Sequence, residues 1–396
     1  MADKKDQHYV PRFYMKRFSN ESNLVDIMRV SDGEVIKEVN YRSQCKKAYF
    51  YGSDLKWENQ LSQYEDRWSK VFIQIDNQKE LDENEIKSIK EFALFQRLRT
   101  SGEFSHHYQE RTELFKMYVQ ELCLMNGFDY DDEVKNVIKQ NVDKSLSPSD
   151  LLDVINAIEK TIDDLSVVFI IYSTQNKLII SDVPIIMINP FHSPSIGLGC
   201  VGLVILFPVS VDTLAVIYDS NVYKTNAGFL YVESTNESEV ETLNRLQYIS
   251  ADKIILGKTR DHFPELKKEL IDIRSMNRDV NPVSRLGEGN NQLLVVDSRK
   301  TLLDEPLSFA LINHSIGKIP FEFREGVQRK WTETWEQKLK NKSRIMSEIY
   351  PKSPELLNRF TIKEIRDGCS RFYREMIRYW IANGTREVIN DIESSN

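Results

Sequence analysis

Three short segments of this sequence combine imidazole, guanidinium, amide and carboxylate groups in patterns that could support catalysis or ligand binding. The first is the N-terminal arm Gln7–Ser19, QHYVPRFYMKRFS, which holds His8 among aromatic and basic residues. The other two are FQRLR, with Gln96, Arg97 and Arg99, and ISDVP, with Asp182. An imidazole can serve as a general base, guanidinium groups bind phosphate, and carboxylates bind divalent metal ions.

Two glutamates on a predicted helix are further candidates for metal binding. Glu58 and Glu65 are seven residues apart, so they lie on nearly the same side of a helix. Together with His8 and Asp182 they could hold Mg²⁺ or Mn²⁺, because these ions take oxygen ligands and an occasional imidazole. The alternative is that each glutamate forms a salt bridge with a cation of the arm, at Arg12, Lys16 or Arg17.

The position of Gln96 conflicts with the apolar pattern around it. The periodicity over Asp82–Leu98 predicts a helix with Ile86, Ile89, Phe92 and Ala93 on its inner face. Gln96 falls on that face, and Arg97 and Arg99 fall at its borders. A buried amide without partners costs about 1–3 kcal/mol, so Gln96 must be hydrogen-bonded. Either it belongs to a helix-end network that satisfies nearby loop carbonyls, or it faces a substrate.

Asp182 also has two interpretations. An aspartate close to a proline commonly forms an Asx turn, whereas a carboxylate at a strand end can belong to a site built on a rigid scaffold. The sequence contains no HExxH, Walker, GxSxG or glycine-rich dinucleotide motif, so these hydrolase and nucleotide-binding signatures are absent. The remaining histidines lack obvious partners and are interpreted as surface or turn residues.

The predicted fold class is α+β, because strands and helices are segregated along the chain. Pro11 predicts that the arm enters extended and turns into a helix near Arg12. A β-hairpin is predicted over Asn23–Asn40, with its turn at Ser31–Gly33. Further helices are predicted from Asp54, over Asp82–Leu98, from Ser105 to Gly127, and over Leu151–Ile162, Glu237–Ile249 and Phe263–Arg274.

Short runs rich in β-branched residues predict one antiparallel sheet. They are Leu165–Tyr172, Leu178–Ser181, Ile185–Asn189, Cys200–Phe207 and Leu214–Tyr218, with later strands at Lys253–Leu256 and Gln292–Val296. We divide the chain into an arm, hairpin and helical lobe (1–163), the antiparallel sheet with packed helices (164–274), and a mainly helical C-terminal extension (292–396). The segment Arg274–Asn291, rich in Asn, Gly, Pro and Arg, is the predicted linker.

Composition and charge bear on whether this protein binds nucleic acid or a membrane. The net charge of −7 opposes a generally cationic, nucleic-acid-coating surface and leaves only local basic patches. The apolar runs are far shorter than the ~20 residues that span a bilayer, and Met1–Gln7 is polar, so we expect no membrane partner and a cytoplasmic location. Four scattered cysteines without CxxC spacing predict reduced thiols and no zinc finger.

The segments HYVPRFYMKRF, FALFQRLR and ISDVP, in this order and at these separations, resemble the family catalogued as domain of unknown function 4238, found mostly in bacteria. Within the resemblance, which covers about Gln7 to Leu256, WENQLSQYE is similar to the glutamate-bearing helix, LFPVS to a proline-containing strand and LNRLQYISADKIIL to the closing helix and strand. The family usually shows Ser-Asp-Asn-Pro, whereas this chain has Ser-Asp-Val-Pro at residues 181–184, with Val183 in place of the asparagine. The kind of family implies a role in bacterial anti-phage defence or a toxin system.

Two functions of different classes follow. The first is a metal-assisted phosphodiesterase or nuclease-like effector, with His8 as base, Arg97 and Arg99 as phosphate clamps, and Glu58, Glu65 and Asp182 as ligands of Mg²⁺ or Mn²⁺. The second is a non-catalytic binding or sensor module that captures an anionic ligand or a partner segment with the same polar cluster. In both, His8, Arg97 and Asp182 are predicted to meet in one pocket with at least one glutamate. A purely structural alternative is a salt-bridge network that fixes the arm.

Overall fold

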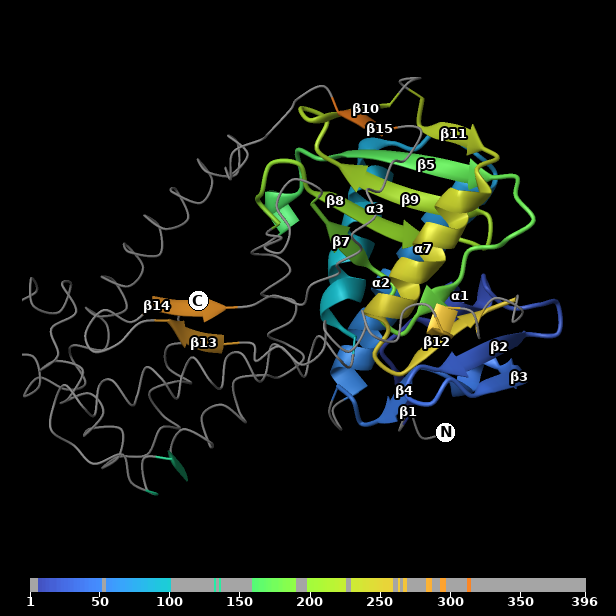
Figure 1. Cartoon of the computed structure of the whole chain (residues 1–396), viewed down its shortest axis with the longest axis vertical. Coiled ribbons are helices and arrows are strands. Elements are labelled where there is room, and N and C mark those ends of the chain that lie inside the picture. Colours follow the sequence, from blue (N-terminus) through green and yellow to red (C-terminus); the bar gives the residue numbers. More distant parts are fainter. Residues whose placement is uncertain are drawn as a thin grey trace, which may run out of the picture. The chain divides into compact units, whose positions relative to one another are not determined.

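The structure is a computed structural model that describes residues 6–51, 55–100, 159–189, 198–225 and 229–258, together with isolated residues and short strands elsewhere. The chain forms two compact units, Met1–His107 with Ser147–Arg324 and Tyr108–Leu146 with Glu325–Asn396. Nearly all the described residues lie in the first unit, and the fold below is the fold of that unit (Figure 1).

The arm enters as a strand and turns into a short helix, as its sequence predicts. Strand β1 (Asp6–His8) pairs antiparallel with β4 (Lys46–Ala48), and helix α1 (Arg12–Lys16) begins directly after Pro11, whose φ is −57°. The 3₁₀ helix η1 (Tyr41–Ser43) leads into β4. The arm is buried rather than draped over the surface: Val10, Tyr14, Met15 and Phe18 are fully enclosed.

The predicted hairpin is confirmed as β2 (Leu24–Arg29) and β3 (Val35–Asn40). It belongs to a four-stranded sheet of order β3-β2-β12-β6, in which β12 is Ile254–Gly257 and β6 is Ile180–Ser181. The run Leu178–Ser181 was predicted to join the other central strands, and this is wrong. Its strand β6 pairs with β12 instead, because the chain leaves the main sheet after β5 and returns to it only at β7.

The main sheet has five strands in the order β11-β5-β9-β8-β7. They are β5 (Ser166–Tyr172), β7 (Ile186–Ile188), β8 (Val204–Pro208), β9 (Thr213–Tyr218) and β11 (Tyr231–Ser234). Strands β7, β8, β9 and β5 pair antiparallel, as predicted, whereas β11 runs parallel to β5. The sheet is therefore mixed, and the α+β class is confirmed.

Helices cover both faces of this sheet, which explains why its strands are continuous apolar runs. Alternate residues Phe169, Ile205, Phe207, Ala215 and Ile217 pack in one core cluster with α1, α2 (Leu55–Asp76) and α3 (Glu83–Leu98). The residues between them, including Val168, Ile170, Leu206, Leu214 and Val216, pack against α7 (Glu237–Ser250). Figure 1 shows α7 crossing one face of the sheet and α2 with α3 on the other.

Aromatic rings connect the arm, the helices and the sheet in a single core. The ring of Phe92 on α3 lies 5.2 Å from Tyr14 of the arm, 5.4 Å from Trp68 of α2 and 5.4 Å from Phe207 of β8, measured between centroids. Helix α3 begins with a complete capping box in which Asp82 accepts a bond from the Glu85 amide and Glu85 accepts one from the Asp82 amide. The predicted helix over Asp82–Leu98 is thus confirmed.

Other predictions fall partly or wholly beyond the described residues. The predicted linker contains strand β13 (Val283–Leu286), which pairs with β14 (Leu293–Val296), so it is not wholly irregular. Strand β10 (Tyr223–Thr225) pairs with β15 (Ile312–His314). The cap at Asp54, the helices from Ser105 and over Leu151–Ile162, most of Phe263–Arg274 and the helical C-terminal extension lie outside the described residues. None of the described helices is both long and apolar enough to cross a bilayer.

Candidate functional site

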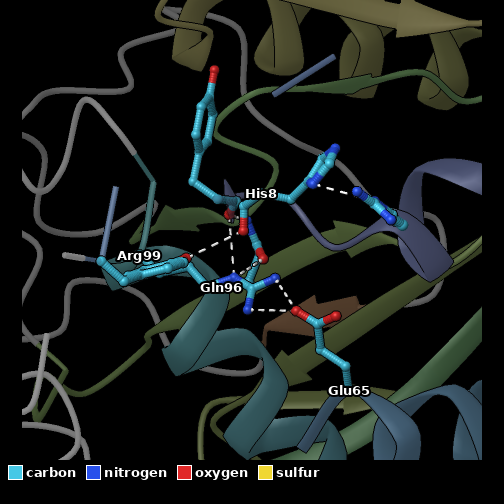
Figure 2. A network of polar contacts seen from close by, with 7 residues as sticks. His8, Glu65, Gln96 and Arg99 are labelled. Carbon is cyan, nitrogen blue, oxygen red and sulfur yellow. Dashed lines mark hydrogen bonds and ion pairs between the residues drawn. The ribbon is translucent and has the colours of Figure 1, made fainter. Parts of the chain in front are cut away.

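The backbone carbonyl of Tyr9 is the point where the arm meets the end of α3. It accepts hydrogen bonds from Gln96 Nε2 at 3.0 Å and from Arg99 Nε at 3.2 Å, and Arg99 Nε also donates to Gln96 Oε1 at 2.9 Å (Figure 2). These are the bonds expected of a helix-end network that satisfies a carbonyl of a neighbouring segment. Both side chains are buried, so their polar groups are committed to the protein itself.

The charge of Arg99 is balanced by Glu65 of α2. Both terminal nitrogens of Arg99 donate to Glu65 Oε1 at 2.9 Å, and the side chain of Arg99 is fully buried while that of Glu65 is 27% exposed. Glu65 therefore pairs with Arg99 and not with a cation of the arm. Arg17 of the arm pairs with Asp76 at the end of α2 instead. This network holds the arm, α2 and α3 together.

His8 points away from this network, toward the outside of the arm (Figure 2). Its Nε2 donates to the Arg42 carbonyl at 2.9 Å, and its Nδ1 accepts a bond from Arg12 Nε at 3.3 Å. The pKa of His8 is lowered to about 4, mainly by burial and further by the cations Arg12, Lys46 and Arg99, although the bond to the Arg42 carbonyl raises it in part. His8 is therefore neutral at physiological pH, and a role as general base would require it to release the bond from Arg12.

Three exposed cations belong to the residues that contact or pair with His8, and we call Arg12, Arg42 and Lys46 the basic surface. The Arg42 guanidinium lies over the Tyr41 ring, 5.8 Å from its centroid, and its Nε donates to the Tyr41 hydroxyl at 3.4 Å. Lys46 sits directly opposite His8 in the β1–β4 pair, so the two side chains share one face. Lys46 forms an ion pair with Asp6 at 2.5 Å, which offsets part of its charge. Arg12 uses only Nε within the described residues, and its two terminal nitrogens remain available to a ligand.

Sequence reasoning missed Arg42 and Lys46. A pairing of β1 with β4 brings them to His8 across more than thirty residues of chain, and no local periodicity signals that pairing. The available signal was the density of cations, since RSQCKK places three of them within six positions. Arg12 was considered only as a salt-bridge partner of a glutamate, a contact that the structure does not form with Glu65.

Asp182 binds backbone amides from the start of β12. Its Oδ1 accepts a bond from the Asp252 amide at 2.8 Å, and its Oδ2 accepts one from the Lys253 amide at 3.0 Å. The carboxylate is buried, and burial together with the negative charge of Asp252 raises its pKa to about 6 despite these bonds. Asp182 thus ties β6 to the chain that returns from α7, rather than forming a local Asx turn.

The inner side of the arm brings Tyr9 and Cys45 close to Asp182. Burial raises the pKa of the Tyr9 hydroxyl, and the nearby Cys45, Asp182 and Asp252 raise it further. Burial also raises the pKa of the Cys45 thiol, with Asp182 as the next contribution. A thiol with a raised pKa carries little thiolate, so Cys45 is not an activated nucleophile.

Arg97 lies next to the loop that follows Asp182. Its Nη1 donates to the carbonyl of Ile185 at 3.1 Å. His8, Arg97 and Asp182 are therefore carried by elements that meet, but in the bonds described here they bind three different backbone groups. The single pocket that would unite them stays a prediction.

The residues proposed as metal ligands fit that role unequally. Both oxygens of Asp182 accept backbone amides, and Oε1 of Glu65 is held by Arg99, whereas Oε2 of Glu65 is not used in that pair. Across the described part of the chain, no three His, Cys, Asp or Glu side chains are grouped closely enough to hold a metal ion. The side chain of Glu58 lies outside the described residues.

Replacing Arg99 tests the network that fixes the arm. Arg99→Ala leaves the Glu65 carboxylate without its partner and removes a donor from the Tyr9 carbonyl, so we expect the free energy of unfolding to fall by roughly 3–5 kcal/mol. Arg67→Ala is the matched control, because Arg67 pairs with Glu91 but is 50% exposed, and it should cost about 0–1 kcal/mol. Urea denaturation measures both, and equal losses would contradict a special role for Arg99.

The pKa values of His8 and Asp182 predict opposite effects of pH on stability. The pKa of His8 is lowered from 6.5 to about 4, so its contribution is present above pH 6.5 and lost as the pH falls through about 4. The pKa of Asp182 is raised from 3.8 to about 6, so its contribution is present below pH 3.8 and lost as the pH rises through about 6. Between about pH 4 and pH 6, the two contributions to the free energy of unfolding therefore change in opposite directions.

We therefore expect His8→Gln and Asp182→Asn to change the pH profile in opposite directions. Relative to the unmodified protein, His8→Gln should lose stability as the pH rises from 4 to 6, and Asp182→Asn should gain it. Urea denaturation at steps across this window provides the two difference curves. Difference curves that slope in the same direction would show that these groups do not titrate as described.

The comparisons with known proteins agree with the segments that build this site. A family model described as "Protein of unknown function (DUF4238)" matches residues 6–261. No curated protein and no solved structure matches the chain. The matched range contains the arm, η1, β4, α2, α3, the loop around Asp182 and β12, which together form the contacts above. It spans more than half of the sequence, and this protein therefore belongs to the DUF4238 family.

Proposed function

We propose that the chain binds an anionic, phosphate-bearing ligand at the basic surface of Arg12, Arg42 and Lys46. The observation that carries the proposal is that His8, a histidine held neutral, contacts or pairs with three residues whose cationic side chains are exposed. A neutral His8 orients the Arg12 guanidinium through its Nδ1 and holds the Arg42 backbone through its Nε2. The proposal keeps the binding or sensor function but places it at these cations rather than at Arg97 and Arg99.

The chemistry of these side chains suits phosphate. The terminal nitrogens of Arg12 form the planar fork that binds two phosphate oxygens, and an ammonium such as that of Lys46 adds a point charge. The net charge of the chain is −7, so a positive region must be local, and it would attract polyanions against the general field of the protein. Arg99 does not take part, because its guanidinium is buried and paired with Glu65.

Titration with inorganic polyphosphate tests this proposal. Isothermal titration calorimetry of the full chain should show binding that weakens with salt, and Arg12→Ala and Arg42→Ala should each lower the affinity roughly tenfold and reduce the salt slope by about one. Lys70→Ala, which removes an exposed cation of α2, is the charge-matched control and should change little. Absence of binding, or an equal loss in the control, would overturn the proposal.

A second candidate is a metal-assisted phosphodiesterase or nuclease-like effector of the kind that defence and toxin systems use. The observation in its favour is Oε2 of Glu65, which lies outside the pair with Arg99 on a helix that also carries Glu58. With Mg²⁺ or Mn²⁺ bound there, the ion would polarise a phosphate oxygen. A cytoplasmic location is part of both proposals, and the described cysteines Cys45 and Cys200, present as thiols, fit a reducing compartment.

Incubation of the protein with DNA and RNA in the presence of Mg²⁺ or Mn²⁺ tests the second candidate. Cleavage should occur, and Glu65→Gln should abolish it while Lys70→Ala leaves it unchanged, with thermal melting used to show that both variants are folded. Absence of cleavage with either metal, or cleavage that survives Glu65→Gln, would rule out a nuclease that uses Glu65.

A further inference from the structure

The two strands that carry His8 and Lys46 also bring a carboxylate to the basic surface. Asp6 and His8 are two residues apart in β1, so their side chains lie on the same face of the strand. In the pairing with β4, Lys46 lies opposite His8 and Ala48 lies opposite Asp6. Lys46 is thus the diagonal neighbour of Asp6, and its Nζ lies 2.5 Å from Asp6 Oδ2. The chain therefore places one of its own anions on a cation of the basic surface.

Arg12 and Lys46 differ in their partners. The positive charges of both lower the pKa of His8, so both lie near its imidazole ring. Arg12 donates to His8 Nδ1 and forms no ion pair with an acid in the described part of the chain. Lys46 has the Asp6 carboxylate as its ion-pair partner. One cation can thus receive an external anion directly, whereas the other is already paired with an anion of the chain itself.

The pair of Asp6 with Lys46 is exposed, so a stronger anion can displace the carboxylate. The side chain of Asp6 is 50% exposed and that of Lys46 is 33% exposed, so water and salt weaken the attraction between them. The pair of Arg99 with Glu65 is the opposite case, because the side chain of Arg99 is fully buried. A carboxylate carries a single charge, whereas polyphosphate presents a row of charges to the same ammonium. Polyphosphate can therefore replace Asp6 at Lys46, but it has to break that pair to do so.

We propose that Asp6 is an intramolecular competitor at the basic surface: it occupies Lys46 when no ligand is bound, and a phosphate-bearing ligand must displace it to bind that ammonium. The inference rests on the proposed function, because it adds the regulation of the same surface. Since the competitor belongs to the chain, its effective concentration at Lys46 is constant, and it lowers the affinity for the ligand by a fixed factor.

A double-mutant cycle on Asp6 and Lys46 tests the competition. In isothermal titration calorimetry of the full chain with inorganic polyphosphate, Asp6→Asn should tighten binding about threefold, because it releases Lys46 from an exposed ion pair. In the Lys46→Ala background the same substitution should change the affinity by less than about 1.5-fold, because the ammonium for which Asp6 competes is absent. Asp6→Glu keeps the negative charge and should keep the affinity of the unmodified chain.

Asp66→Asn is the charge-matched control. It removes an exposed carboxylate of α2 and changes the net charge of the chain by the same amount as Asp6→Asn. Its effect on the affinity should be less than about 1.5-fold, because salt screens exposed charges that do not contact the ligand. Thermal melting of each variant shows whether it is folded, and Asp6→Asn should lose little stability because its ion pair is exposed.

The outcomes separate this inference from the proposed function. Polyphosphate binding that Asp6→Asn does not tighten, or that Asp66→Asn tightens equally, would overturn the competition while leaving phosphate binding intact. An equal gain from Asp6→Asn in the presence and absence of Lys46 would show that Asp6 acts through its general field, and it would also overturn the inference. Failure of the unmodified chain to bind polyphosphate would overturn both the proposed function and the inference.

Discussion

The structure depends on the burial of the Arg99 charge against Glu65. A guanidinium that is fully enclosed is tolerable only if a carboxylate and further acceptors surround it, and here Glu65, Gln96 and the Tyr9 carbonyl supply them. Each acceptor comes from a different place: α2, the last turn of α3 and the arm. The requirement to satisfy one buried cation therefore fixes three elements relative to one another, and every other feature of the site is arranged around the arm in that position.

The same kind of contact recurs throughout the core. The Tyr14 hydroxyl donates to the Pro208 carbonyl at 2.6 Å, and Arg17 Nε donates to the Val209 carbonyl at 2.6 Å, so the arm also holds the end of β8. Gln247 of α7 accepts from the Ser181 amide and donates to the Pro184 carbonyl, next to the amides bound by Asp182. Polar side chains of the arm and of α7 thus form hydrogen bonds with backbone groups of distant segments. Among the described residues, these backbone groups have no partner within a helix or a strand pair.

The inner side of the arm forms these structural hydrogen bonds, whereas the candidate binding residues lie on its outer side. Successive side chains of β1 alternate: Gln7 points inward and bonds to Tyr51, while His8 points outward among cations. The inner residues anchor the backbone of the arm, so less backbone entropy would be lost when a ligand binds to the outer cations. Under the proposed function, stability and ligand binding would therefore use opposite faces of one short strand.

The sequence by itself determined the local elements and one important orientation. Alternation and a Gly-containing turn predicted the β2–β3 hairpin, the capping residues and the apolar stripe predicted α3, and the same stripe placed Gln96 inside. These features depend on neighbouring residues, and their periods can be read along the chain. The α+β class followed from the same local patterns.

Only the tertiary structure decided which distant groups meet. It paired Glu65 with Arg99, moved β6 into the hairpin sheet, and placed Lys46 opposite His8. One carboxylate can pair with any of several cations, and a short apolar strand fits any open sheet edge, so composition and spacing leave these choices open. Burial resolves them, because once the helices and sheets pack, each enclosed charge has only the partners that the packing brings within hydrogen-bond distance.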